Sequence, residues 1–129
     1  VKYRENFRPF APAVMEEFSH LIFDLEKSSK VDFMEKTVQV KKNWQKVLPA
    51  ITHVDNSARV QTVSKSYNKK FYGLINEFYK ITKVPVLVNT SFNLNGQPIV
   101  CDPTDAVKTF YSCGLDILAI GNFVVEKDD

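Results

Sequence analysis

Residues 84–93 read VPVLVNTSFN, and this stretch decides the fold class. Its first five residues are all apolar, and such an unbroken run is typical of a strand buried on both faces of a sheet. Pro85 stands near the start of the run, where a missing backbone N–H is tolerated. The run passes directly into Asn89, Thr90, Ser91 and Asn93. Polar side chains at the carboxyl end of a buried strand lie where open α/β sheets bind ligands.

Outward from this strand, the apolar pattern alternates between helical and strand spacing. It predicts helices at 14–23 and 102–113, and between them a helix of about three turns that is marked by the apolar positions of 71–78 and ends before Pro85. It predicts strands at 33–41, 84–88, 117–120 and 123–125. It further predicts a hairpin of 51–54 with 58–63, and exposed connections at 24–32 and 41–46. The sequence therefore predicts a single α/β domain, bordering on α+β, with an open, twisted mixed sheet and about three helices.

Composition excludes several classes of protein. The 129 residues are 44% hydrophobic and 25% charged, which is typical of one globular domain. A net charge of +2 argues against nucleic-acid binding. No apolar stretch approaches the roughly 20 residues that span a bilayer, and the first residues given do not read as a signal peptide, so a cytoplasmic protein is expected. Cys101 and Cys113 are too few for a disulfide framework, and neither they nor His20 and His53 have metal-ligand spacing, so no metal site is expected.

The arginines are candidates for binding an anion. Only three of the seventeen basic residues are Arg, namely Arg4, Arg8 and Arg59. A guanidinium group binds phosphate or carboxylate with a planar pair of donors, which Lys cannot do. On an extended chain, Lys2 and Arg4 project from the same face, which suits a phosphoryl group. The alternatives are ordinary ion pairs, of Arg59 with Asp55 across the predicted hairpin and of Arg4 with Glu5 or Glu17.

The segment after the buried strand offers uncharged polar groups. Ser91 and Asn93 are two residues apart and are expected to point to one side, where a hydroxyl and an amide would face a polar ligand. The alternative is that this Asn-rich, Gly-ended segment is only a turn. His53 is expected to line the core or a ligand site rather than to act as a general base.

Longer blocks of the sequence resemble one known family. KYRENFRPFAPAV at residues 2–14 is similar to the signature of the carbamoyltransferase C-terminal domain of NodU/CmcH-type O-carbamoyltransferases, which act on antibiotics and nodulation factors. The resemblance continues through ITHVDNSARVQ at 51–61, PVLVNTSFN at 85–93 and GQPIVC at 96–101. Residues 24–46 diverge from the family pattern.

The resemblance implies a YrdC-like domain that forms carbamoyl-adenylate from carbamoyl phosphate and ATP, with Mg²⁺ accompanying ATP. A larger N-terminal domain, which holds iron, then transfers the carbamoyl group to a hydroxyl. The resemblance implies catalytic roles for Lys2, Arg4, Arg59 and Ser91, and substrate or nucleotide contacts for Arg8, His53, Asn89, Thr90 and Asn93.

In the family, an arginine-containing GPRALGxRS segment and the iron-binding domain come before the part that this sequence matches. We therefore expect residues 1–129 to be a fragment of a longer transferase, inactive by itself, with the N-terminal domain of its parent chain as a partner. The hydroxyl acceptor and the oligomeric state stay open, a homodimer included. The alternative function is a non-catalytic nucleotide- or RNA-binding module, or a scaffold, on a YrdC-like frame.

Overall fold

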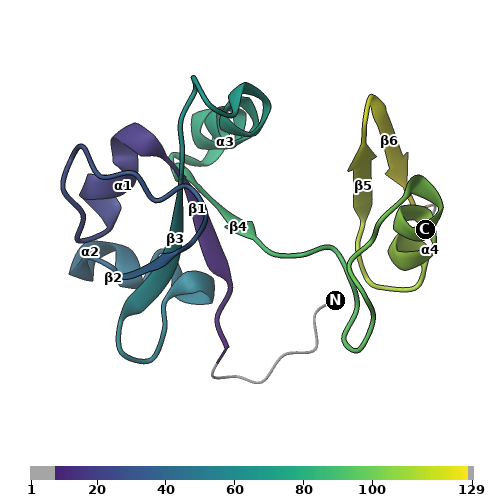
Figure 1. Cartoon of the computed structure of the whole chain (residues 1–129), viewed down its shortest axis with the longest axis horizontal. Helices are drawn as coiled ribbons and strands as arrows, with labels where there is room; N and C mark the ends of the chain where they lie inside the picture. The colour runs from purple at the N-terminus through teal and green to yellow at the C-terminus, as the bar shows by residue number, and fades with distance from the viewer. Residues whose placement is uncertain (1–7, 128–129) are drawn as a thin grey trace. The chain divides into compact units, whose positions relative to one another are not determined.

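The computed structural model describes residues 8–127, which form two compact units, residues 8–90 and residues 91–127 (Figure 1). They are named here the N-terminal unit and the C-terminal unit. Both combine helices with β-strands, which confirms the predicted mixed α/β class. No helix in the described part of the chain is long and apolar enough to cross a membrane.

The N-terminal unit is built on a four-stranded sheet in the order β2-β3-β1-β4. The strands are β1 (Ala11–Met15), β2 (Lys36–Gln39), β3 (Ser57–Val63) and β4 (Val86–Asn89). β1 runs parallel to β3, with Ala13 opposite Gln61, and antiparallel to β4, with Ala13 opposite Leu87. β2 runs antiparallel to β3. The sheet is open and mixed, as the sequence predicts.

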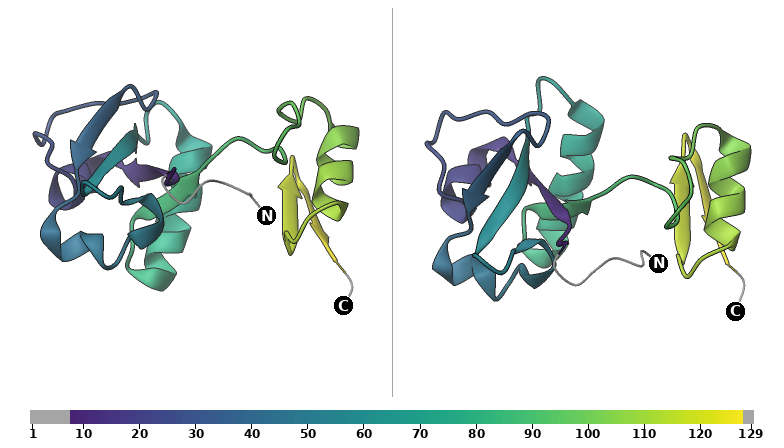
Figure 2. Two further views of the ribbon diagram at one scale, coloured as in Figure 1. Left: turned by 90° about the horizontal axis from the view of Figure 1, so that it is seen from below. Right: turned by 60° about the horizontal axis from the view of Figure 1, so that its bottom comes forward.

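Helices cover both faces of this sheet (Figure 2). α1 (Glu16–Ile22), α2 (Lys42–Gln45) and the short 3₁₀ helix η1 (Pro49–Ile51) lie on one face, and α3 (Lys69–Thr82) lies on the other. Because side chains alternate along a strand, Val14 and Val60 point toward α1, whereas Ala13 and Val63 point toward α3. The sheet therefore has a core on each side.

The predicted helix at 14–23 is wrong at its start. Val14 lies in β1, and the helix begins only at Glu16. All five residues of β1 are buried because this strand lies inside the sheet, between β3 and β4. An entirely buried strand shows no alternation, and Val14 happens to stand at helical spacing from Phe18 and Ile22.

The predicted hairpin of 51–54 with 58–63 is also wrong. Ile51 ends the 3₁₀ helix η1, and the chain then makes a turn in which Asn56 has a φ of 65°. The predicted turn between the two segments is therefore present, but the strands that pair with β3 are β2 and β1. The 58–63 strand itself is confirmed.

Two further segments differ from the prediction. Residues 41–46 contain α2, whose Trp44 packs against the core on the α1 face, instead of forming an exposed connection. The strand at 84–88 is confirmed as β4, but it is not buried on both faces, since Val88 is 50% exposed. β4 is an edge strand, and on the α1 face Val86 belongs to the core whereas Val88 does not.

The C-terminal unit packs α4 (Pro103–Tyr111) against a hairpin of β5 (Ile117–Ile120) and β6 (Phe123–Glu126). Ala106, Phe110 and Leu118 form its core. The Asp102 carboxylate caps α4 by accepting a hydrogen bond from the Asp105 backbone N–H at 2.8 Å. This helix and both strands are confirmed.

Candidate functional site

Three polar side chains share the sheet face on which α3 packs. Arg59 and Gln61 project from β3, and Asn89 projects from the last residue of β4. Continuing the β1–β3 register by two residues places Arg59 beside Ala11, and Ala11 is paired with Asn89 on its other side. Arg59, Ala11 and Asn89 therefore form one row across three strands. Strand spacing separates the Cα atoms of Arg59 and Asn89 by roughly 10 Å.

Small side chains on β1 let the polar groups meet across the sheet. Ala11 and Ala13 separate β3 from β4 on this face, and both are buried. Above them, Asn89 Nδ2 donates a hydrogen bond to Gln61 Oε1 at 2.8 Å. A longer side chain at either alanine would stand between the two amides.

The orientation of both amides is fixed by a backbone carbonyl. Gln61 Nε2 donates to the carbonyl oxygen of Asp32 at 2.8 Å. A carbonyl oxygen only accepts, so the nitrogen of the Gln61 amide must face Asp32 and its oxygen must face Asn89. The Asn89 nitrogen must therefore face Gln61, which directs Asn89 Oδ1 away from it.

Asp32 is held in turn through the residue before it. The Val31 backbone N–H donates to Thr62 Oγ1 at 2.9 Å, and the Val31 carbonyl accepts from the Thr62 backbone N–H at 2.7 Å. Val31 and Thr62 are buried. The loop that supplies the Asp32 carbonyl is thus attached to β3 beside Gln61.

Arg59 is not paired with Asp55. The Asp55 carboxylate accepts hydrogen bonds from the Ser57 hydroxyl at 2.7 Å and the Ser57 backbone N–H at 3.0 Å, and these hold the pKa of Asp55 below its ordinary value. Arg59 is exposed, and its guanidinium makes no hydrogen bond or ion pair with any of residues 8–127. The ion-pair alternative is therefore wrong for the described part of the chain.

His53 lies in the turn before β3. Its backbone N–H donates to the Ser57 carbonyl at 2.8 Å, and its carbonyl accepts from the Asn56 N–H at 3.0 Å. The side chain is half-buried. A role for His53 in contacting substrate stays a prediction.

Ser91 and Asn93 lie together, as their spacing predicts. The Ser91 hydroxyl and Asn93 Oδ1 are hydrogen-bonded at 2.7 Å, and Asn93 Nδ2 donates to the Gln97 carbonyl at 2.9 Å. The second bond closes a turn that includes Gly96 at a φ of 77°. The segment therefore forms a turn and also holds the Ser91 and Asn93 side chains together, so the predicted turn and the predicted pair are both present.

The predicted site residues are distributed over both units. Arg59, Asn89 and Thr90 belong to the N-terminal unit, and Ser91 and Asn93 belong to the C-terminal unit. Lys2 and Arg4 lie outside the described residues. Arg8 is the first described residue, and it is exposed.

Gln61 was missed by sequence reasoning. The signal that could have identified it is its place two residues after Arg59 on a strand, which puts both side chains on one face.

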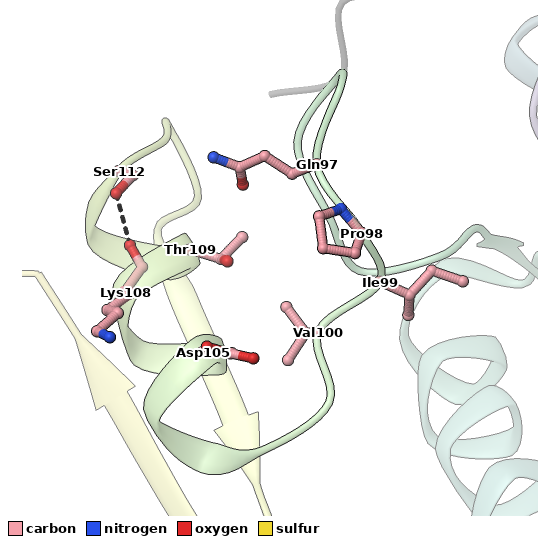
Figure 3. Close-up of a pocket in the computed structure, with 8 residues that line it drawn as sticks. All are labelled: Gln97, Pro98, Ile99, Val100, Asp105, Lys108, Thr109 and Ser112. Atoms are coloured by element: carbon pink, nitrogen blue, oxygen red, sulfur yellow. Dashed lines mark hydrogen bonds between the residues drawn. The ribbon is translucent and has the colours of Figure 1, made fainter.

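The C-terminal unit has a hollow of its own, of about 330 Å³, between residues 97–100 and α4 (Figure 3). Asp105, Lys108 and Thr109 line it from the helix, and none of the predicted site residues lines it. Nearby, potential ligand atoms of Cys101, Asp102 and Asp105 lie within 4.8 Å of one another. Sequence spacing did not indicate this cluster, whose Asp102 carboxylate already caps α4.

Comparison with known proteins gives one consistent result. Residues 1–127 match the family described as Carbamoyltransferase C-terminus. Nodulation protein NolNO of Sinorhizobium fredii is 46% identical over 128 residues, which cover 98% of this chain and 19% of the relative. Nodulation protein NolO of Bradyrhizobium diazoefficiens is also 46% identical, over 98% of this chain and 23% of the relative. Nodulation protein U of Rhizobium tropici is 38% identical over 106 residues, which cover 82% and 18%.

The chain thus spans about a fifth of the length of these curated relatives. The match extends over nearly the whole of its own sequence and includes the segments that carry Arg59, Gln61 and Asn89. The chain belongs to the carbamoyltransferase C-terminus family.

Proposed function

We propose that this chain is the part of an O-carbamoyltransferase that binds ATP and carbamoyl phosphate and forms carbamoyl-adenylate. Another part of the longer protein then transfers the carbamoyl group to a hydroxyl acceptor. The observation that carries the proposal is the Gln61–Asn89 hydrogen bond on the sheet face from which Arg59 also projects. Within residues 8–127 Arg59 has no ion-pair partner, and the extended β1–β3 register places it in one row with Ala11 and Asn89. Carbamoyl phosphate is a small anion that also carries an amide, so the row offers a partner for each of its ends.

The chemistry needs positioning and charge. Carbamoyl phosphate reacts with water to give carbamate and phosphate, and a carbamate oxygen then attacks the α-phosphorus of ATP while pyrophosphate leaves. Negative charge develops on the non-bridging oxygens of the α-phosphate, and cations placed there in advance stabilise the transition state more than the ground state. Arg59 supplies such a cation in the form that suits phosphate oxygens. Mg²⁺ arrives with ATP as part of the substrate.

The roles of the remaining residues are proposed from the family resemblance. Lys2 and Arg4 add positive charge, and Ser91 and Asn93 contact polar atoms of the adenylate or the carbamoyl group. Arg8, His53 and Thr90 are proposed as further substrate or nucleotide contacts. No side chain acts as a nucleophile, so the rate depends on orientation and electrostatics. Cytoplasmic ATP is the nucleotide source in this proposal.

Isotope exchange between pyrophosphate and ATP, measured on the natural full-length protein, tests the proposal. We expect exchange that requires carbamoyl phosphate. Arg59→Ala should lower kcat/KM by about 10²–10³, which is typical of losing one group that stabilises developing charge. Arg59→Lys should recover part of this loss, because Lys keeps the charge but not the paired donors.

Lys70→Ala is the matched control, since Lys70 is an exposed cation on α3. It should leave the exchange unchanged. If carbamoyl phosphate drives no exchange although ATP still binds, the chain is a nucleotide-binding module and the proposal is wrong. An RNA-binding role is disfavoured by the net charge of +2, because non-specific RNA binding depends on phosphate neutralisation.

A further inference from the structure

We infer that Asn89 recognises the NH₂ of the carbamoyl group, which donates a hydrogen bond to Asn89 Oδ1, and that Gln61 is the positioning residue that keeps this oxygen facing the ligand. The inference rests on the proposed function, because carbamoyl phosphate and carbamate are the molecules that bring this NH₂ to the site. It goes further by assigning one end of the substrate to one atom of the protein.

The hydrogen bonds leave Asn89 with an acceptor to offer. An asparagine amide has one oxygen and one NH₂, and the nitrogen of Asn89 is already bonded to Gln61 Oε1. Within residues 8–127, no donor contacts Asn89 Oδ1. Asn89 is half-buried at the end of β4, so its amide is held by the sheet rather than extended into solvent.

The fixed orientation matters because a carbamoyl group resembles an acetyl group in shape. The carbamoyl NH₂ is a donor, whereas the acetyl CH₃ is not. Asn89 Oδ1 accepts a hydrogen bond from the carbamoyl NH₂, but an acetyl CH₃ in the same place leaves this oxygen without a donor. The unmet hydrogen bond weakens binding of the acetyl compound. An Asn89 amide turned by 180° would present its own NH₂ and lose this discrimination. The Asp32 carbonyl prevents that turn by fixing Gln61.

The row also separates the two ends of the substrate. Extending the β1–β3 register past Ala13 places Arg59 and Asn89 on opposite sides of Ala11. In the proposed complex, the oxygens that carry negative charge therefore face the guanidinium while the carbamoyl nitrogen faces the amide. The single methyl group of Ala11 leaves space above β1 between them.

Competition between two acyl phosphates tests the inference on the natural full-length protein. The assay is carbamoyl phosphate-dependent pyrophosphate–ATP exchange, with acetyl phosphate as the competing inhibitor. We expect the wild-type ratio of the acetyl phosphate Ki to the carbamoyl phosphate KM to be at least about tenfold, the usual effect of one unmet hydrogen bond. Asn89→Ala should bring the ratio near one by raising the KM, with the Ki changed less than about twofold, because acetyl phosphate does not use Oδ1.

Gln61→Met should lower the same ratio several-fold, because it releases the Asn89 amide without removing it. Gln39→Ala is the matched control. Gln39 is an exposed amide that lies opposite Ser57 on the same sheet face. It takes no part in the hydrogen bonds that join Asp32, Gln61 and Asn89. It should leave both constants unchanged.

The outcomes separate the two proposals. Exchange that depends on carbamoyl phosphate, together with an unchanged ratio in Asn89→Ala, overturns the inference and leaves the proposed function standing. An equal rise of both constants shows a purely structural role and also overturns it. If Asn89→Ala does not fold, the ratio in Gln61→Met decides. Absence of exchange in the wild type overturns the proposed function and this inference with it.

Discussion

Replacing Thr62 with Val removes one hydroxyl from the interior of the N-terminal unit. Thr62 is 3% exposed, and its Oγ1 accepts the backbone N–H of Val31, which is 0% exposed, at 2.9 Å. Val has nearly the same shape as Thr, so the substitution leaves the Val31 N–H buried without a partner. A buried donor left unsatisfied costs about 1–3 kcal/mol, and we expect the free energy of unfolding to fall by that amount.

Urea unfolding followed by tryptophan fluorescence measures this loss. Trp44 is the only tryptophan in the sequence, and it packs against the core of the N-terminal unit, so its emission reports on that unit. Thr37→Val makes the same chemical change at an exposed position of β2 and should shift the free energy of unfolding by less than about 0.5 kcal/mol. A difference of less than about 0.5 kcal/mol between the two variants would refute the reasoning.

Two further predictions concern α3. Ile75 is fully buried against Ala13, Met15 and Val63, so Ile75→Ala should cost about 2–5 kcal/mol in the same urea assay. Leu74→Ala, at a neighbouring position that is 59% exposed, should cost less than about 1 kcal/mol, and equal losses would contradict the assigned face. The hydrogen bond from Tyr72 to Glu17 raises the pKa of Tyr72 from 10.0 to about 12. Its stabilising contribution is therefore complete below pH 10 and is lost as the pH rises from about 10 to about 12. Glu17→Ala should return the pKa toward 10, seen as earlier tyrosinate absorbance, and an unchanged late titration would be the contrary result.

The sequence predicted the helices and strands in which buried and exposed residues alternate at regular spacing. Phe71, Leu74, Ile75 and Phe78 locate α3 correctly, and Asp102 marks the start of α4. β1 was hidden because all five of its residues are buried, which removes the alternation that identifies a strand. The partners of β3 were mispredicted because sequence reasoning favours the neighbouring segment, whereas pairing with β1 is decided by long-range packing.

Some residues of the candidate site could likewise be predicted from the sequence, and one could not. Arg59 and Asn89 were candidates from the sequence alone. Arg59 is one of only three arginines, and Asn89 is the first polar residue after an apolar run. Gln61 did not, because one glutamine in a strand has no local signal. Its partners, Asp32 and Asn89, are 29 and 28 residues away in the chain, and only the sheet topology brings them to it.

Among the four strands of this sheet, β1 is synthesised first, and its neighbour β4 is synthesised last. Both of its neighbours, β3 and β4, follow α1, β2 and α2 in the chain, so Ala11–Met15 must wait for pairing partners made much later. Such non-local pairing is slow, and an apolar strand without partners promotes aggregation in the meantime. Pro12 lies in the middle of this segment and has no N–H, and its regular pairing with β3 begins only at Ala13. A residue that is unusual in an interior strand thereby discourages association with other newly made chains until the proper neighbours exist.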